Sequence, residues 1–483
     1  MNENDLDLGM AALRAGRWDE GIARLRAVVA TRPGFAEIWS NLGYALRMTG
    51  QHMEARDALE RAVRLAPNLA DAWNLLGLTD QEAGRHDQAR REFDRAIALR
   101  PAFAAALMNR ANSDQALGHI DAALAGYARA LAIEPANAAV HYNLAHLHQK
   151  RMGDYERAQD EYRQAIRLDP QLADAHLNLA HMLFALGSFA EGWREFAWRP
   201  QRRAYEAAMA SAGRRYEVPA TIPGELHLRG EQGLGDILFF LRFAAVAAKG
   251  GTRIAFNGDR RLHPLLERTG LFTSLSSEES LPPAERPELL VGDLPLVVDA
   301  AGRLFPESLR FEARPQALDA IGRRLNAAGP APWIALTWRA GERSLGLFDR
   351  LFKEAPIAEL GAALRGKPAT WISVQRAPAA GEREALALAL GAPVHDFSDV
   401  NADFESALAT LDLAADYVGV SNTNMHLRAG LGHPARVLVP FAPEWRWGLQ
   451  GNSPWFPAMT TYRETAGRDW SRALGELSRD MRP

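Results

Sequence analysis

The hydrophobic pattern changes its period near the middle of the chain. In the first part, apolar residues recur at helical spacing, as in Ala55, Leu59 and Val63, which predicts amphipathic helices. In the second part, short apolar runs such as 253–256 and 370–374 alternate with helical patterns. Strands separated by helices are typical of parallel sheets that are covered on both faces. The pattern therefore predicts a helical array followed by an α/β region.

The first part of the chain is an internal repeat. Glycines recur at intervals of 34 or 35 residues, at Gly16, Gly50, Gly84, Gly118, Gly153 and Gly187. Prolines recur with the same spacing, at Pro33, Pro67, Pro101, Pro135 and Pro170. Each interval between a glycine and a proline holds one helical pattern, so glycine is expected to end one helix of a pair and proline to mark the turn after the other. A helix pair of this length resembles the tetratricopeptide repeat, and stacked repeats form a superhelix with a concave face. The single extra residue lies between Pro135 and Gly153.

Two positions of the repeat carry residues whose side chains suggest a role in binding. Aligned by period, the first position holds Trp39, Trp73, Leu107, His141 and His176. Two residues later come Asn41, Leu75, Asn109, Asn143 and Asn178. A carboxamide is a donor and an acceptor together, so it can pair with the backbone of an extended peptide without reading its sequence. The alternative is that asparagine is simply tolerated on a wet helix face. The pattern resembles the asparagine ladder of the O-linked N-acetylglucosamine transferase superhelix, which implies that Asn41, Asn109, Asn143 and Asn178 bind an acceptor polypeptide.

The boundaries of the repeats and of the later segments follow from these patterns. The repeats are expected to occupy 1–199 and to end in an aromatic-rich helix at 192–199, and 200–222 is expected to be a polar linker. The α/β region contains two series of strands and helices, at 223–315 and 316–483. Its last expected strand is 435–439. Two series predict two Rossmann-like halves, with a cleft between the carboxyl ends of their strands.

A glycine-rich turn separates the first strand of this region from its first helix. The run 229–236 reads Arg-Gly-Glu-Gln-Gly-Leu-Gly-Asp. Gly233 and Gly235 can adopt a positive φ and let a ligand approach the backbone. Free backbone N–H groups and the helix dipole at such a turn attract an anion. Asp236, in the first turn of the helix, could cap that helix or accept a proton from a reacting hydroxyl.

Composition narrows the class of protein. The formal net charge is −3 and there is no cysteine, which argues against nucleic acid as the main partner and excludes disulfides and thiolate metal sites. The polar segment 1–5 is not a signal peptide. No run approaches the ~18 apolar residues of a membrane span. We therefore expect a cytoplasmic protein with no membrane span.

Several motifs of the α/β region carry a family resemblance. They are Glu231-Gln232-Gly233-Leu234-Gly235-Asp236, Ser373-Val374-Gln375-Arg376, His426-Leu427-Arg428-Ala429-Gly430-Leu431-Gly432, Pro440-Phe441-Ala442-Pro443-Glu444-Trp445-Arg446-Trp447 and Ser453-Pro454-Trp455-Phe456-Pro457, followed by Tyr462-Arg463 and Asp469-Trp470. With them, 225–470 resembles the glycosyltransferase domain of bacterial repeat-containing glycosyltransferases, which is related to the heptosyltransferases. The expected fold class is thus α plus α/β: a tetratricopeptide superhelix followed by a GT-B domain. That domain would place the acceptor side in 223–315 and the nucleotide-sugar side in 316–483.

The resemblance implies an inverting transfer from a nucleotide-sugar, with Asp236 as the general base. The leaving nucleotide would be a diphosphate or a monophosphate. The residues expected to hold the donor are Gly233, Gly235, Arg339, Arg343, Lys353, Gln375, Asn422, Thr423, Asn424 and His426. Arg376 is a further cationic candidate. We expect no metal and no other cofactor, because the Asp-x-Asp pattern occurs at Asp5-Leu6-Asp7, in the first repeat, and His-Glu-x-x-His is absent. Cations and a helix N-terminus would then balance the charge of the leaving group.

Two loops depart from the family pattern. After the strand 416–420 the run is Ser421-Asn422-Thr423-Asn424-Met425-His426, so the aspartate that relatives carry there is missing, although Asn422, Thr423 and Asn424 are good helix-capping residues. After Trp338, arginine replaces the usual small residues, and Arg339 would favour an extra anionic group on the donor. The tryptophans at 445–447 either stack on the nucleotide base or sugar or anchor the C-terminal helix across both halves; we favour the anchor.

Three functions remain open from the sequence. The first is a protein O-glycosyltransferase whose repeats hold an acceptor polypeptide; by analogy this acceptor would be a bacterial flagellar or surface protein. The second is a non-catalytic binding scaffold with a degenerate transferase domain, which the altered loop at 421–426 favours. The third keeps the transferase but gives it a glycan acceptor, with the repeats recruiting a complex. The sequence leaves the sugar, the nucleotide and the oligomeric state open.

Overall fold

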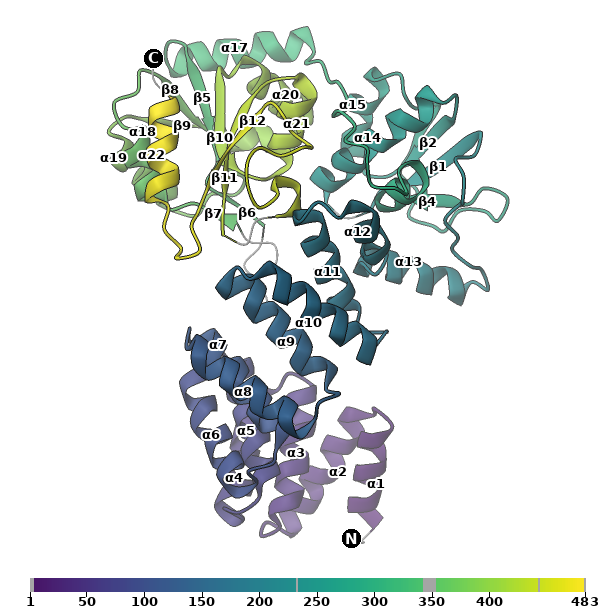
Figure 1. The fold of residues 1–483 in the computed structure, drawn as a ribbon, viewed down its shortest axis with the longest axis vertical. Helices are drawn as coiled ribbons and strands as arrows, with labels where there is room; N and C mark the ends of the chain where they lie inside the picture. Colours follow the sequence, from purple (N-terminus) through teal and green to yellow (C-terminus); the bar gives the residue numbers. More distant parts are fainter. Residues whose placement is uncertain (1–3, 232, 342–352, 442–443, 482–483) are drawn as a thin grey trace. The chain divides into compact units, whose positions relative to one another are not determined.

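The protein forms two compact units. The computed structural model describes residues 4–231, 233–341, 353–441 and 444–481 (Figure 1). The repeat unit is Met1–Pro170, and the sheet unit is Gln171–Pro483. The last expected pair of repeat helices therefore belongs to the sheet unit, whereas the sequence pattern predicts that this pair belongs to the repeats.

The repeat unit consists of antiparallel helix pairs. Its helices are α1 (Asn4–Arg14), α2 (Trp18–Thr31), α3 (Ala36–Met48), α4 (His52–Leu65), α5 (Ala70–Glu82), α6 (His86–Leu99), α7 (Ala104–Ala116), α8 (Ile120–Ile133), α9 (Ala138–Leu147) and α10 (Tyr155–Leu168). The periodic glycines end the first helix of each pair in the left-handed conformation, with φ between 66° and 82°, which a side chain would resist. The predicted tetratricopeptide array is confirmed in this region.

The extra residue of the fourth interval is absorbed by a change of helix type. The segment η1 (His148–Met152) is a π-helix that continues α9 and ends at Gly153, which has φ 66°. A π-turn contains one residue more than an α-turn. The following helix, α10, still packs on α9, as the second helix of every other pair of this unit packs on the first.

The aromatic position of the repeat fixes the turn that precedes its helix. Trp39 Nε1 donates a hydrogen bond to the carbonyl oxygen of Pro33 at 2.9 Å, and Trp73 Nε1 does the same to Pro67 at 3.0 Å. His141 Nε2 lies 3.4 Å from the carbonyl oxygen of Pro135. A ring nitrogen at this position therefore satisfies a carbonyl group that has no helical partner.

The sheet unit begins with three helices that follow the last repeat. They are α11 (Ala173–Ala185), α12 (Phe189–Phe196) and α13 (Pro200–Ser211). Arg199, at the start of α13, is buried and paired with Glu231 and Asp293. The expected linker 200–222, predicted to be helical around 204–212, begins with the helix α13, which buried charges attach to the first sheet.

The first sheet has four parallel strands in the order β3-β2-β1-β4. The strands are β1 (Glu225–Arg229), β2 (Arg253–Asn257), β3 (Ser274–Ser276) and β4 (Glu288–Leu290). The main helix of this half, α14 (Leu234–Lys249), follows β1 directly and is apolar along most of its length; α15 (His263–Arg268), the short 3-10 segments η2 (Arg260–Leu262) and η3 (Val291–Asp293), and α16 (Leu294–Val298) complete it.

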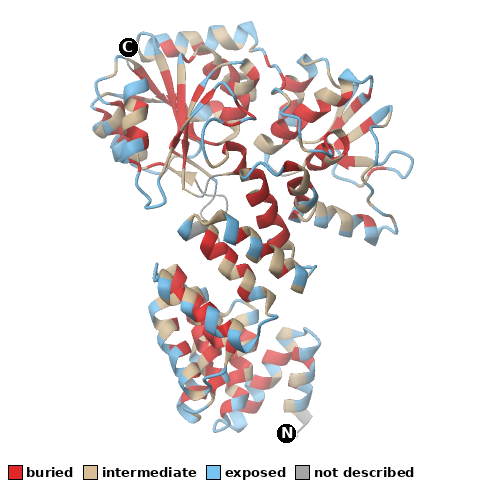
Figure 2. Cartoon of the chain, in the orientation of Figure 1, coloured by how far each residue is buried: buried red, intermediate tan, exposed pale blue. Residues whose placement is uncertain are grey.

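The second sheet has six parallel strands in the order β12-β11-β10-β5-β8-β9. The strands are β5 (Trp333–Leu336), β8 (Thr370–Ser373), β9 (Val394–Asp396), β10 (Asp416–Val420), β11 (Ala435–Val439) and β12 (Met459–Arg463). Numbered within the half, this is the order 3-2-1-4-5-6 of a doubly wound α/β fold; in such folds ligands lie at the strand ends where the order reverses. Here that point lies between β5 and β10. The central strands β8 and β10 are almost wholly buried (Figure 2).

The remaining elements of the second half cover its sheet. They are α17 (Pro315–Ala328), α18 (Ile357–Leu364), α19 (Glu382–Leu390), η4 (Ser398–Ala402), α20 (Phe404–Leu413), α21 (Thr423–Leu431), η5 (Trp445–Trp447) and α22 (Ser471–Asp480), with a small antiparallel pair β6 (Arg339–Ala340) and β7 (Lys353–Glu354). The sequence pattern missed β3, β9 and β12, and 435–439 is not the last strand. Only Met459 and Tyr462 of β12 are buried, because β12 forms the edge of the sheet, and so it lacks the continuous apolar run of the central strands.

Aromatic side chains join the last repeat helices to both halves. Trp193 of α12 is buried, and its ring centroid lies 5.7 Å from that of Trp445 and 6.1 Å from that of Phe240. Trp455 packs edge-on against Phe239 of α14 at 5.1 Å. Aromatic pairs of this kind contribute about 0.5–1.5 kcal/mol each beyond the area they bury. The tryptophan-rich segment thus packs the halves against each other. It does not hold the C-terminal helix across both halves, as the sequence led us to expect, because α22 packs on α18 and β12 within the second half.

Candidate functional site

Two helix N-termini, one from each sheet, meet at the proposed donor site. Gly235 in the first turn of α14 packs against the first turn of α21. A methyl group added to Gly235 would lie 3.1 Å from His426 Cδ2 and 3.6 Å from Thr423 Cα. Gly233 is the N-cap of α14, with φ −79°, and provides no side-chain acceptor for the helix. Neither glycine uses a positive φ; the turn needs Gly235 for close approach instead.

Four charged side chains form successive ion pairs at this contact between α14 and α21. Asp236 on α14 pairs with Arg446 of η5, and Arg446 pairs in turn with Glu444. Glu444 Oε2 lies 2.5 Å from Lys353 Nζ and accepts a hydrogen bond of 2.8 Å from Ser421 Oγ. Lys353 Nζ also donates to the carbonyl oxygen of Ser421 at 3.2 Å. Two of the three protons of the ammonium group are used, so one can reach a further acceptor.

The burial of these groups sets their charge. Burial acts to raise the pKa of Glu444, but the charges of Lys353 and Arg446 outweigh it and hold that pKa well below its usual range. Burial lowers the pKa of His426 far below its ordinary value, and Arg446 and Arg242 act in the same direction. Glu444 is therefore ionised and His426 neutral at pH 7. The Nδ1 atom of His426 is buried without a hydrogen-bond partner.

The first loop residues after β10 cap α21. The Asn422 Oδ1 atom accepts the backbone N–H of Asn424 at 3.0 Å and the hydroxyl of Tyr417 at 3.1 Å. Asn422 Nδ2 donates to Thr337 Oγ1 at 3.1 Å. Burial raises the pKa of Tyr417 to about 12, so its hydroxyl keeps its proton. The helix-capping prediction for Asn422 is confirmed, and its amide is engaged inside the protein, while Thr423 remains half-buried at the junction with Gly235.

The other residues expected to bind the donor lie at the ends of β5 and β8. Gln375 Oε1 accepts the N–H groups of Trp338 and Arg339 at 3.0 Å each, and its Nε2 donates to the carbonyl groups of Arg339 and Arg376 at 3.1 Å each. Gln375 therefore ties the two strand ends together. Arg339 pairs with Glu382 at 2.9 Å, and Arg376 is exposed. Arg343 lies outside the described residues.

The four asparagines of the repeats differ in their contacts. Asn109 is buried and donates to Asn74 Oδ1 at 3.0 Å, and Asn143 donates to Asn112 Oδ1 at 3.0 Å. These two amides link neighbouring helices. Asn178 is buried on α11, in the sheet unit. Asn41 lines a cavity in the first repeats.

Sequence reasoning did not assign a role to Glu444 or Arg446. Both lie in the Glu-Trp-Arg-Trp run, between tryptophans. Charges placed among large apolar residues are buried, and buried charges need partners of opposite sign. The tryptophans around Glu444 and Arg446 therefore predict that both charges form buried ion pairs. The sequence does not identify their partners Lys353 and Asp236, because these residues are distant along the chain and only the fold brings them into contact.

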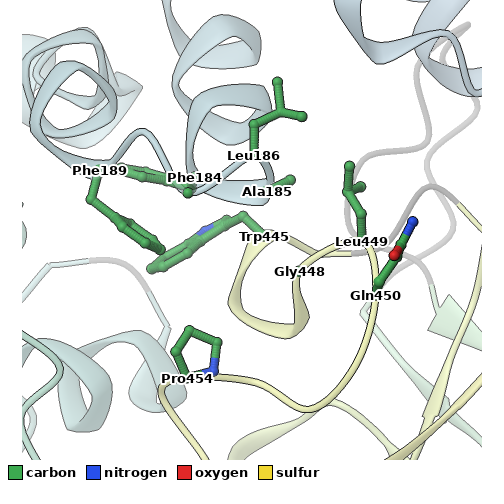
Figure 3. A pocket seen from close by; sticks show the side chains of 10 residues that line it. Phe184, Ala185, Leu186, Phe189, Trp445, Gly448, Leu449, Gln450 and Pro454 are labelled. Atoms are coloured by element: carbon green, nitrogen blue, oxygen red, sulfur yellow. The ribbon is translucent and has the colours of Figure 1, made fainter.

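An apolar cavity of about 390 Å³ lies beside Trp445, between the turn after α11 and the loop 448–454. Figure 3 shows Phe184, Phe189 and Trp445 along its wall, with Leu449 and Gln450 across from Leu186. No charged residue lines it. Within the described parts of the chain, no group of three or more His, Asp or Glu side chains is placed to hold a metal ion, and no helix is both long and apolar enough to traverse a bilayer.

The comparisons with known proteins concern the N-terminal region. Models of the tetratricopeptide repeat match residues 6–70 and 74–113, and a TPR repeat model matches residues 150–187. The N-terminal region therefore contains tetratricopeptide repeats, which bind peptide or protein partners. No curated protein matches the chain.

Similar solved structures are repeat proteins. MamA protein is 22% identical, with 36% of this chain and 93% of that chain covered and a TM-score of 0.31. TTC0263, a thermophilic TPR protein of Thermus thermophilus, is 22% identical, with 38% and 98% covered and a TM-score of 0.33. YrrB, a TPR protein with an unusual peptide-binding site, is 19% identical, with 35% and 88% covered and a TM-score of 0.31.

Proposed function

We propose that this chain is a glycosyltransferase that moves a sugar from a nucleotide-sugar to a hydroxyl group of a polypeptide bound by its repeats. The observation that carries the proposal is the meeting of α14 and α21 at Gly235, with Asp236, Lys353 and Arg446 around the contact. The strand order of the second sheet supports the proposal, because ligands of doubly wound sheets bind at the strand ends where the order reverses, which here are the ends of β5 and β10.

The charges of this site suit a departing nucleotide. Lys353 and Arg446 would face the phosphate groups, and the N-termini of α14 and α21 add partial positive charge. Preorganised charge of this kind stabilises a leaving group in a water-poor site. Lys353 would exchange Glu444 for a phosphate oxygen when the donor binds. No metal ion is part of the proposal.

Asp236 would act as the general base. Its side chain is one-third exposed, so an acceptor hydroxyl can approach it. The carboxylate would take the hydroxyl proton as the oxygen attacks the anomeric carbon and the nucleotide departs, which inverts the configuration. General-base assistance is worth about 10²–10⁴ in rate. Arg446 would orient the carboxylate.

The test uses Asp236→Asn, which keeps the shape of the side chain and removes its basicity. The full-length protein is incubated with a panel of nucleotide-sugars, and release of the nucleotide is followed by phosphorus NMR. We expect the wild type to release one nucleotide and Asp236→Asn to do so at least about 10²-fold more slowly, with unchanged nucleotide affinity. Equal rates would assign the base to another residue.

A second candidate function is a binding scaffold without turnover. The observation that favours it is the internal pairing of the expected donor ligands: Lys353 with Glu444, Arg339 with Glu382, and Asn422 with Tyr417 and Thr337. In a scaffold these contacts would be permanent. A folded protein that binds no nucleotide would support this function over the first.

A further inference from the structure

The first repeats contain a second cavity, which the transferase chemistry does not use. Its volume is about 420 Å³, and it lies among α1, α2 and α3. Leu13 and Met10 form its apolar wall, and the rings of Trp18 and Tyr44 meet edge to face at 5.9 Å beside it. Arg14 and Asn41 complete the lining. We refer to it as the first-repeat pocket.

The polar groups of this pocket differ from their equivalents elsewhere in the repeats. Asn109 and Asn143 donate to other asparagines, whereas Asn41 has no hydrogen-bond partner among the described residues. The exposed Arg14 guanidinium likewise has no carboxylate partner there, although Arg17, three residues later, pairs with Glu20 at 2.9 Å. An amide and a cation without partners therefore stand beside an aromatic surface.

These three features match one kind of ligand. An amide can pair with both the N–H and the neutral carbonyl of one residue in mid-chain. The guanidinium binds a carboxylate, in a bidentate manner where geometry allows. The Trp18 and Tyr44 rings accept an apolar side chain. A terminal residue would offer its carboxylate in place of the neutral carbonyl, so the Asn41 amide favours an internal segment.

We propose that the first-repeat pocket binds an internal segment of an extended polypeptide in which an aspartate or glutamate adjoins an apolar residue. The acidic side chain pairs with Arg14, the backbone with Asn41, and the apolar side chain lies against Trp18 and Tyr44. This inference deepens the proposed function, because it rests on a polypeptide occupying the repeats and states which residues that polypeptide carries. It involves no turnover.

The test is a selection of displayed random peptides, each followed by a constant C-terminal extension, against the full-length protein. We expect the wild type to enrich peptides with an acidic residue next to an aromatic or aliphatic one. The selected peptide is then synthesised with Asp or Asn (or Glu or Gln) at the acidic position and titrated. The neutral peptide should bind about two- to fivefold more weakly, which is the range of an exposed ion pair.

The controls separate a binding role from a structural one. With Arg14→Gln the acidic and neutral peptides should bind equally, and Arg14→Lys should restore part of the difference. Arg17→Gln, on the same turn, should behave as the wild type. The proposal would be overturned if the wild type enriched no such peptides, or if Arg14→Gln kept the same preference for acidic peptides. It would also be overturned if Arg14→Gln lost thermal stability while its peptide choice stayed unchanged. Because no sugar is transferred, these outcomes are independent of whether the sheet unit is a transferase.

Discussion

Arg446 illustrates how single residues define the proposed site. Its guanidinium is buried between the Phe239 and Trp445 rings, 4.7 Å and 4.5 Å from their centroids, and contacts Asp236 and Glu444. Burial acts to lower the pKa of Arg446, but the two carboxylates outweigh it and raise that pKa. One cation thus connects the expected base on the first half to the expected donor ligand Lys353 on the second.

A substitution at Gly235 tests whether the close contact between α14 and α21 matters for stability and nucleotide binding. Gly235→Ala would place a methyl group 3.1 Å from His426 Cδ2, so the buried His426 ring must give way by a few tenths of an ångström. We expect a loss of about 1–3 kcal/mol in stability, typical of overpacking, with weaker nucleotide binding, measured by thermal unfolding and calorimetry.

Gly233→Ala is the matched control for this prediction. Its added methyl group would meet Asp236 Oδ2 at an ordinary 3.5 Å, and its φ of −79° suits alanine. The loss there should stay below about 1 kcal/mol, the cost of a poorer N-cap. Equal losses in the two variants would refute a special role for Gly235.

Glu92 gives the repeat unit a pH-dependent stability. It is buried on α6, where burial raises its pKa from an ordinary 4.5 to about 8, with nearby Asp80 adding to the shift and a hydrogen bond from Gln88 opposing it. Because the folded pKa is raised, the stabilisation by the protonated form is complete below pH 4.5 and is lost as the pH rises through 8. Hydrogen exchange of α5 and α6 should therefore speed up between pH 5 and pH 8 beyond its intrinsic pH dependence.

Glu92→Gln should abolish that dependence, since the amide mimics the protonated acid. The opening free energy of α5 and α6 at pH 8 should rise in this variant by more than about 1 kcal/mol, because each pKa unit corresponds to about 1.4 kcal/mol. Glu134→Gln, at an exposed position, should change nothing. A wild type whose opening free energy is constant from pH 5 to pH 8 would contradict the account.

At the scale of elements, the ion pairs of Arg199 attach α13 to the first sheet. Its Nη1 lies 2.8 Å from Asp293 Oδ1, and its Nη2 lies 2.5 Å from Glu231 Oε1. Tyr216 donates to Asp293 Oδ2 at 2.6 Å, and Arg202 contacts Oδ1 at 3.1 Å. These groups fill the carboxyl ends of β1 and β4, the point where the strand order of the first sheet reverses.

Removing one partner of this buried network should be costly. Arg199→Gln leaves two carboxylates without their main cation, and breaking a buried pair typically costs about 3–5 kcal/mol. The melting temperature of the sheet unit should fall by several degrees in calorimetry. Arg194→Gln, on the exposed face of α12, should leave it unchanged; a similar loss in both variants would show that the network contributes nothing specific.

The elements could be predicted from the sequence where the pattern was strong. The strands 416–420 and 435–439 agree with the structure to the residue, because apolar runs mark them. β12 was missed, since this edge strand has only two buried residues, and the burial of Arg199 could not be predicted because its partners are distant in sequence. Helix-capping by Asn422 was readable locally, whereas the use of Gln375 as a strand tie depends on tertiary contacts.

At the scale of the whole molecule, the chain combines repeats that bind polypeptides with a sheet unit that we propose to bind a nucleotide-sugar. The repeats alone are compatible with either a transferase or a scaffold. What separates the two functions is whether Lys353 can exchange Glu444 for a phosphate group at the ends of β5 and β10.

The measurement that tests this most directly is a calorimetric titration of the full-length protein with UDP, GDP, ADP, TDP, CDP and CMP in the absence of metal. We predict that one of them binds with a Kd in the micromolar range, about −8 kcal/mol. Lys353→Ala should weaken it at least about tenfold, a loss of about 1.4 kcal/mol, while Lys367→Ala, whose ammonium group contacts Ser478 instead, should bind as the wild type. A folded protein that binds none of the six nucleotides would contradict the proposed transferase and favour the scaffold.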